Sequence, residues 1–354
     1  MEKVGAYTER ATEIGEWRPG NPGLGQQATP MLAAYFNMLQ RELVGVVEKA
    51  GLELDPEDDG QLLRAIRGGI TTLAADTALT ASHAGLLLLD ASGGNRLITL
   101  PASNAALGVI DVIVRRTDNT GNRLKVQADG ADKIKFHTHL SAAGYGFLYL
   151  MGAGDWWHLR SDGQGNWWPI ARRDDSPLGR LSFETSTAIQ PGGYGLPHGV
   201  LFVRADWPWV WDHAQASGML VNDASRVGFE GCWTRGDGAT TVRSPDVRAE
   251  FLRSLDEGRG IDLNRIAGSS QKATFVAVGS GPAADGITTF SDLAGAAGRA
   301  ALGLDTASLS EYVGAKCSNP GNSSTPVFAA TDVDMTYGTV RPRNITYPAR
   351  IKLI

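Results

Sequence analysis

The chain has 354 residues, and its 33 lysines and arginines against 38 aspartates and glutamates give a formal net charge of −5. This slightly acidic balance argues against nucleic acid as a partner, because nucleic-acid-binding surfaces are basic. A hydrophobic content of 42% excludes general disorder, and two cysteines exclude a disulfide framework. No uninterrupted apolar stretch is long enough for a transmembrane helix, so we expect no membrane insertion.

The first predicted helix follows an arm of turn-forming residues, 1–28. Thr29 and Pro30 resemble an N-cap and a first helical position, and Gly51 marks the end of the helix. Inside this segment apolar residues follow the a/d pattern of about two heptads. The pattern predicts a helix that packs against copies of itself, and the alternative is an amphipathic helix docked on its own chain. The candidate trimer-interface residues are Leu32, Phe36, Leu39, Leu43 and Val46.

A second helix and then an all-β module are predicted next. The helix covers Pro56–Arg67 and is capped by Asp55. After Thr80 the hydrophobic period changes to two, and turn residues separate the apolar runs. Within each of the tryptophan pairs at 156–157 and 167–168, adjacent side chains point to opposite faces, so we expect one member of each pair to be buried. The predicted strands are 86–89, 96–100, 109–115, 123–127, 133–137, 146–151 and 156–160.

The last part of the chain has irregular strands and long loops. Residues 172–177 are charged and polar up to Pro177, which favours a solvated linker before a separate domain. An alanine-rich stretch, 291–302, predicts a short helix. We therefore divide the chain into residues 1–75, 76–173 and 174–354.

Three separated segments resemble bacteriophage tail fibre proteins. The segment 39–51 together with 61–66 is similar to the helical N-terminal region of many tail fibres, and 86–168 is similar to a β module of fibre shafts. The third segment, Gly236-Asp-Gly-Ala-Thr-Thr241 with 245–253 and 256–260, resembles the tail-collar fibre motif. Residues 340–344 resemble the closing strand of that motif, after an apparent insertion at 272–335.

The resemblance implies a mainly β protein with an α-helical N-terminal region, built as an elongated homotrimeric fibre with β-modules and an irregular collar-like C-terminal domain. It implies a virion location, in which residues 1–75 attach to other tail or baseplate proteins and 76–173 form a shaft. Residues 174–354 are then expected to bind a bacterial surface receptor, either a polysaccharide or a pilus. The resemblance implies no catalytic residues, and no cofactor is expected.

A tryptophan-rich segment supplies the candidate receptor-binding residues. Three indoles at 207, 209 and 211 lie on one face if the segment is an extended strand, and a row of indoles suits stacking on sugars. Neighbouring polar groups are able to bond sugar hydroxyls. The alternative is a core strand or a contact between chains. The candidates are Trp207, Trp209, Trp211, Asp212, His213 and Trp233.

His137 and His139 are the candidate metal ligands. Alternate residues of a strand share a face, so three copies around a threefold axis supply six imidazoles, enough for an octahedral metal. The alternative is a partly exposed histidine pair without metal.

Two other functions compete with host attachment. Some phage tailspikes hydrolyse polysaccharide with two carboxylates, but no acidic pair in this chain is favoured over another, and no repeat of about 20 to 25 residues indicates a long parallel β-helix. The chain is therefore expected not to be an enzyme. The other alternative is a structural collar or baseplate component that contacts only virion proteins.

Overall fold

The computed structural model describes residues 2–187, 192–272, 274–279, 304–305, 335–340 and 344–354. Its contacts divide the chain into two units, which we describe separately. The first unit comprises 1–226, 230–254 and 348–354, and the second comprises 227–229 and 255–347. The first unit therefore crosses both expected boundaries, at 75/76 and at 173/174.

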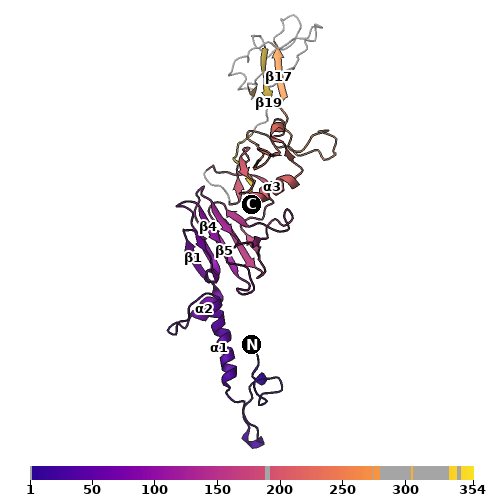
Figure 1. The fold of residues 1–354 in the computed structure, drawn as a ribbon. Coiled ribbons are helices and arrows are strands. Elements are labelled where there is room, and N and C mark those ends of the chain that lie inside the picture. The colour runs from indigo at the N-terminus through magenta and orange to yellow at the C-terminus, as the bar shows by residue number, and fades with distance from the viewer. Residues whose placement is uncertain (1, 188–191, 273, 280–303, 306–334, 341–343) are drawn as a thin grey trace. The chain divides into compact units, whose positions relative to one another are not determined.

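The described residues form mostly β strands with few helices, and the longest helix lies near the N-terminus (Figure 1). The helices are α1 (Ala33–Lys49), α2 (Gln61–Arg67) and α3 (Pro208–Ala216), with short 3-10 helices at Val4–Ala6, Pro22–Leu24, Ala81–His83 and Asp223–Ser225. The strands are β1 (Gly69–Leu73), β2 (Thr77–Ala78), β3 (Gly85–Leu89), β4 (Arg96–Thr99), β5 (Asp111–Arg116), β6 (Leu124–Gln127), β7 (Lys133–Ile134), β8 (Phe147–Leu150), β9 (Trp156–Ser161), β10 (Asn166–Arg172), β11 (Leu181–Phe183), β12 (Tyr194–Gly195), β13 (Leu201–Val203), β14 (Leu220–Val221), β15 (Trp233–Thr234), β16 (Thr241–Arg243), β17 (Thr274–Gly279), β18 (Leu304–Asp305), β19 (Met335–Val340) and β20 (Ala349–Lys352).

Both N-terminal helices begin later than the sequence predicts. Helix α1 starts at Ala33 and not at Pro30, because Thr29 is used to hold the preceding arm: its Oγ1 accepts the Arg18 N–H at 2.9 Å and donates to the Arg10 carbonyl at 2.6 Å. Helix α2 starts after Gly60 and covers only the last seven residues of the predicted span. The expected cap, Asp55, instead accepts the Glu57 N–H within the preceding turn.

The β module is a short β-solenoid, in which successive strands from β1 to β8 belong alternately to two sheets. One sheet has the order β1-β3-β5-β9-β10-β7 and the other has the order β2-β4-β6-β8. The first three strands of each sheet are parallel, whereas β9 and β8 add antiparallel strands. Gly85 pairs with both Gly69 and Val112, so successive turns of the solenoid differ in length. This irregularity explains why no regular repeat is visible in the sequence, although parallel coiling is present.

Alternating burial along the strands places one core between the two sheets. Strands β5 and β9 bury every second residue, and the same buried cluster includes residues of β4, β6 and β8 from the other sheet. The tryptophan pairs follow the predicted alternation: Trp157 and Trp167 are buried, whereas Trp168 is 45% exposed and Trp156 is half-buried. Strand β10 extends through the second pair, as the opposite-face expectation requires, although it lies outside the predicted strand ranges.

The C-terminal strand completes the first unit. β20 lies between β11 and β12, and a second small sheet has the order β13-β16-β15-β14. The predicted linker at 172–177 is not a free segment. Arg172 pairs with Asp175 at 2.9 Å, Asp174 pairs with Lys352 of β20 at 3.2 Å, and Leu178 directly after it is buried. Residues on both sides of 173 therefore belong to one core.

The described part of the second unit contains a three-stranded antiparallel sheet, β17-β19-β18. β19 ends at Val340, the first residue of the expected closing strand, and Asn344 lies outside any strand. The rest of that expected strand and the predicted helix at 291–302 lie outside the described residues.

Candidate interaction sites

The predicted a/d stripe of α1 lies on the exposed side of the helix in the single chain. Phe36 is 38% exposed, Leu43 44% and Val46 41%, while Leu32 and Leu39 are half-buried. The N-terminal arm covers a different part of the helix through its aromatic residues, and its Trp17 touches the edge of the stripe at Phe36. A helix that exposes most of an apolar stripe has an unpartnered surface of the kind that marks an interface.

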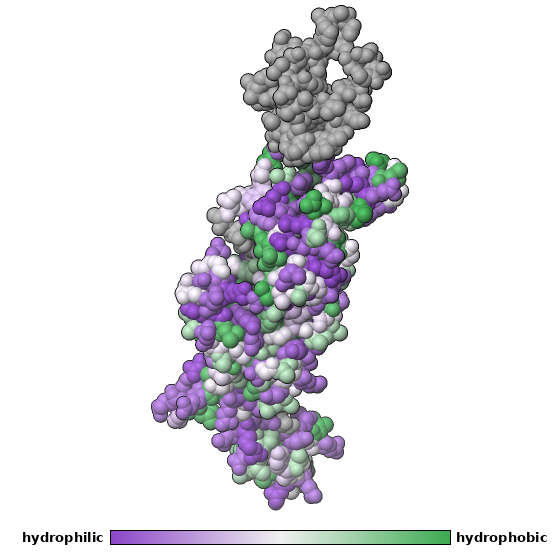
Figure 2. Space-filling model, turned by 45° about the horizontal axis from the view of Figure 1, so that its top comes forward, coloured by the Kyte–Doolittle hydropathy of each residue, from purple (hydrophilic) through white to green (hydrophobic). Residues whose placement is uncertain are grey.

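Exposed apolar residues continue on the elements that follow α1. Leu63 and Ile66 of α2 are 50% and 69% exposed, and Ile70 on the edge strand β1 is 72% exposed. On the face drawn in Figure 2, apolar and polar residues intermix without one dominant apolar patch. The candidate self-association surface is therefore the ordered stripe on α1 and its continuation.

The tryptophan-rich segment is a helix and not an extended strand, which corrects the predicted row of three indoles. Pro208 occupies the first helical position of α3, where the missing N–H costs nothing. At about 100° per residue, Trp209 and Trp211 point to opposite sides of the helix. Trp207 is the N-cap residue, and its ring packs edge-on against that of Trp209 with centroids 5.7 Å apart. Trp209 is fully buried, and its indole N–H donates to the Leu353 carbonyl at 2.7 Å.

The buried Trp209 joins α3 to the β module. Its ring packs against Phe136, Tyr145, Phe147 and Tyr149, with centroid distances of 5.1 to 6.0 Å. A side chain enclosed in this way holds the fold together and has no surface for a receptor.

The other two indoles are only partly available. Trp207 packs against Tyr149 and Phe202, and the Arg204 guanidinium lies 3.6 Å from the centroid of the Trp211 ring. Such stacking is a cation–π contact. Both rings are half-buried.

The remaining receptor candidates also have internal partners. Asp212 accepts the Tyr145 hydroxyl at 2.8 Å, and burial together with this carboxylate raises the pKa of Tyr145. His213 packs edge-on against Trp233, and burial lowers its pKa. Trp233 is only 4% exposed. The structure thus brings the six candidates together around α3, mainly as packing residues.

The two candidate metal ligands do not share a strand face. β7 ends at Ile134, and His137 has a left-handed backbone with φ 49°. The rings of His137 and His139 are perpendicular, with centroids 5.8 Å apart. Among the described residues no group of three or more His, Cys, Asp or Glu side chains is arranged to hold a metal. The predicted arrangement, in which His137 and His139 share one strand face, is therefore wrong.

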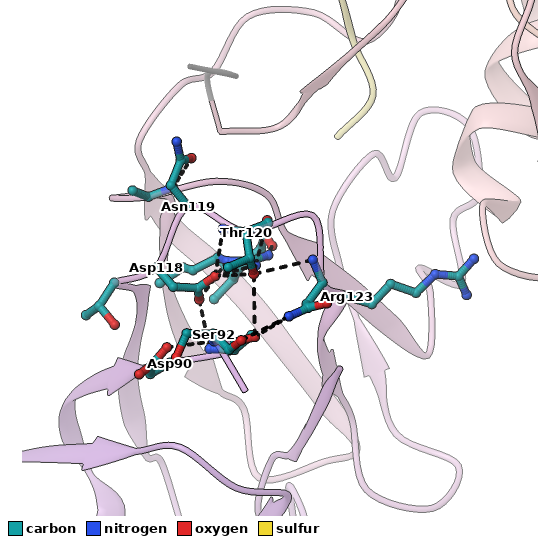
Figure 3. A network of polar contacts seen from close by, with 12 residues as sticks. Asp90, Ser92, Asp118, Asn119, Thr120 and Arg123 are labelled. Atoms are coloured by element: carbon teal, nitrogen blue, oxygen red, sulfur yellow. Dashed lines mark hydrogen bonds and ion pairs between the residues drawn. The ribbon is translucent and has the colours of Figure 1, made fainter. Parts of the chain in front are cut away.

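A buried polar network fixes two turns of the β module (Figure 3). Arg116 is paired with Asp118 at 2.8 Å, and both side chains are at most 6% exposed. The carboxylate also accepts the N–H groups of Ala91 and Thr120, and Arg116 donates to the Leu150 carbonyl. Despite the cost of burial, these donors hold the pKa of Asp118 far below its usual value. The network ties the turns before β4 and β6 to the end of β8.

The collar-like motif forms a self-bonded turn between β15 and β16. The Asp237 carboxylate accepts the Thr240 hydroxyl and the N–H groups of Ala239, Thr240 and Thr241. The bond from the Thr240 hydroxyl, followed by those from the Thr241 and Thr240 N–H groups, lowers the pKa of Asp237. Gly236 has φ 56°, and a Cβ at this position would lie 2.3 Å from the Thr241 Oγ1. These glycine, aspartate and threonine residues therefore have a structural reason to occur together.

One pocket of about 230 Å³ opens where β7 ends beside β10. The Lys135 N–H still donates to the Trp167 carbonyl at 2.8 Å, but the register of β10 shifts between Pro169 and Ala171, which is a β-bulge. The ladder between β7 and β10 covers only Lys133–Ile134 and Asn166–Trp167. The pocket is lined by Lys135, Phe136, His137, Trp157, Pro169, Ile170, Ala171, Arg172 and Asp175.

This pocket was not predicted from the sequence, although His137 was named as a candidate metal ligand. The signal that was present is local: a proline inside an apolar run marks an edge strand or a bulge. The juxtaposition of Lys135 with Arg172, which are far apart in sequence, required the strand order.

Comparison of the sequence with protein-family models and with curated proteins finds no match to either. Within the described residues, no helix combines the length and apolar character needed to cross a membrane.

Proposed function

We propose that the chain is the protomer of a homotrimeric phage tail fibre that attaches the virion to the bacterial surface. The observation that carries the proposal is the exposed a/d stripe of α1, with Phe36, Leu43 and Val46 about 40% exposed. Support also comes from the order of elements, an N-terminal helix followed by a β module, which agrees with the resemblance of the sequence to tail fibres.

Trimerisation gives these exposed groups a partner. Each apolar side chain removed from water contributes about 25 cal/mol per Å² of buried apolar area. Neighbouring chains also cover exposed sheet edges such as β1, where Ile70 is exposed, and uncovered edges promote aggregation. Three linked copies of a weak receptor site then raise avidity by orders of magnitude without any new contact.

Two carboxylates of the C-terminal part, Asp206 and Asp223, have internal partners. Asp206 pairs with Arg123 at 2.9 Å, and Asp223 pairs with Arg243 at 2.8 Å and accepts the Thr234 hydroxyl. Among the residues that the structure describes, no acidic pair is favoured over another, and we propose binding without hydrolysis.

The test is adsorption of the fluorescently labelled full chain to a panel of bacterial strains, compared with the L43D variant. We expect the wild-type trimer to adsorb to at least one strain and the L43D variant to lose most of that adsorption with its avidity. Supernatants should contain no released reducing sugar. Adsorption to none of the strains would contradict host attachment and favour a structural virion component, and released sugar would favour a depolymerase.

A further inference from the structure

The pocket beside β10 brings two cationic side chains into one small space. Lys135 comes from the segment after β7, and Arg172 ends β10. The Lys135 ammonium donates to the carbonyls of Ala142 and Ala143 at 3.3 and 3.0 Å, which uses two of its three donors. The Arg172 guanidinium lies 4.9 Å from the centroid of the Trp157 ring, and it donates through Nε to Asp175 and through Nη2 to the Ser176 carbonyl at 3.5 Å. Both groups retain donors for a ligand.

His137 adds a polar atom that is buried without a partner. Its Nε2 has no hydrogen bond among the described residues, and its backbone lies in the left-handed region. Buried polar atoms normally have partners, and strained backbone is concentrated at functional sites. Burial lowers the pKa of His137 to about 3, so at neutral pH the ring is uncharged and offers one donor and one acceptor.

The walls and size of the pocket restrict the ligand. Pro169, Ile170 and Ala171 supply aliphatic surface, and Asp175 supplies an acceptor on the rim with its side chain 84% exposed. A volume of about 230 Å³ is below the range of drug-sized sites and suits one sugar ring. The charges of Lys135, Arg172 and Asp175 leave one net positive charge in a chain whose own net charge is −5.

We propose that this pocket binds one carboxylate-bearing sugar unit, of the uronic acid type, of an acidic surface polysaccharide. The sugar carboxylate lies between Lys135 and Arg172, the His137 Nε2 and Asp175 bond hydroxyls, and the aliphatic wall contacts the ring. This inference rests on the proposed function because it names the receptor chemistry. It also moves most of the receptor contact from residues 174–354 to the β module, and only Asp175 belongs to the later segment.

The experiment is ligand-observed saturation-transfer NMR on the full chain with glucuronate, with glucose as the uncharged match and acetate as the carboxylate alone. We expect binding of glucuronate at millimolar concentration, weaker binding of acetate and none of glucose. The K135Q variant should weaken glucuronate binding roughly tenfold. The D175N variant should bind about two- to threefold more tightly, because it frees Arg172 and removes a like charge.

The matched control is K133Q, which removes the same charge two residues earlier on β7 and outside the pocket. Binding by K133Q should equal that of the wild type. Equal signals from glucuronate and glucose, equal losses in K135Q and K133Q, or no glucuronate binding up to about 50 mM would each overturn the inference.

The mass of every variant is measured in parallel, so that a change of assembly is not mistaken for loss of the pocket. If the wild type is trimeric and adsorbs to bacteria but does not bind glucuronate, the pocket inference fails and the proposed function stands. If the pocket is instead filled by an acidic side chain of a neighbouring copy, wild-type binding is absent and appears only in the monomeric L43D variant, which also overturns the inference.

Discussion

At the scale of single residues, the β module depends on a few buried charges that are fully bonded. Arg116 and Asp118 satisfy one another and the ends of two turns, and Arg116 also donates to the Leu150 carbonyl. Removing one member of such a pair leaves the other charge buried without a partner, which costs far more than the pair itself contributes.

The D118N variant is therefore expected to lower the free energy of unfolding by about 3 to 5 kcal/mol. The measurement is urea denaturation at pH 7. The matched control is D129N, because Asp129 is an exposed aspartate in another turn of the same module. An equal stability of the two variants would contradict the assigned role of the ion pair.

Asp155 predicts a pH dependence of opposite sign to that of ordinary paired aspartates. It is 5% exposed, and burial raises its pKa from 3.8 to about 6, although the Met151 N–H and the Lys352 charge oppose the shift. The folded chain thus binds this proton more tightly than the unfolded chain. The stabilisation from this group is present below about pH 4 and is lost as pH rises through 6.

The comparison that isolates this group is D155N against the wild type between pH 4 and pH 7. The titration of other carboxylates occurs in both proteins and cancels in this comparison. As pH rises from 4 to 7, we expect the difference in unfolding free energy between D155N and the wild type to change by about 3 kcal/mol in favour of the variant. A difference that is constant across this range would show that Asp155 has an ordinary pKa.

At the scale of elements, α3 packs against the β module and is hydrogen-bonded to the residue that follows the C-terminal strand. Trp209 fills the aromatic cluster and donates to the Leu353 carbonyl directly after β20. We expect W209A to destabilise the chain by about 3 to 5 kcal/mol, as other buried aromatic truncations do. The half-buried Trp211, which stacks with Arg204, is the control, and W211A should cost clearly less in the same thermal or urea denaturation.

Helix α1 carries the assembly prediction. Leu43 is 44% exposed in the single chain, so L43D should leave the fold of the protomer intact while breaking the interface. Q40D places the same charge on an exposed polar position of the same helix and should leave the assembly unchanged. Circular dichroism checks the helix, and light scattering gives the mass. Identical masses for the two variants would show that the stripe is not the interface.

The accuracy of the sequence-based prediction follows the range of the interactions. The strands β5 and β9 were expected nearly at their observed bounds, because alternation between buried and exposed residues is a local property. The parallel pairing of the strands was not predicted, because alternation shows which face of a strand is buried but not which strand lies next to it. The tryptophan-rich segment was wrongly expected to be a strand, because Pro208 fits a helix start as well as a strand edge. The pocket depends on β7 meeting the bulge of β10, which no local pattern specifies.

At the scale of the whole molecule, the first unit contains both sheets of the β module, α3 and β20, and the chain leaves it for residues 255–347 before returning at Pro348. Removal of residues after 173 would therefore expose the aromatic residues that Trp209 covers. For this reason the function is best examined with point variants of the full chain.

The central claim is that the chain works as a homotrimer, and sedimentation equilibrium of the purified full chain at micromolar concentration tests it most directly. We expect a single species of about 113 kDa, three times the 37.6 kDa of one chain. A single species of 37.6 kDa would contradict it.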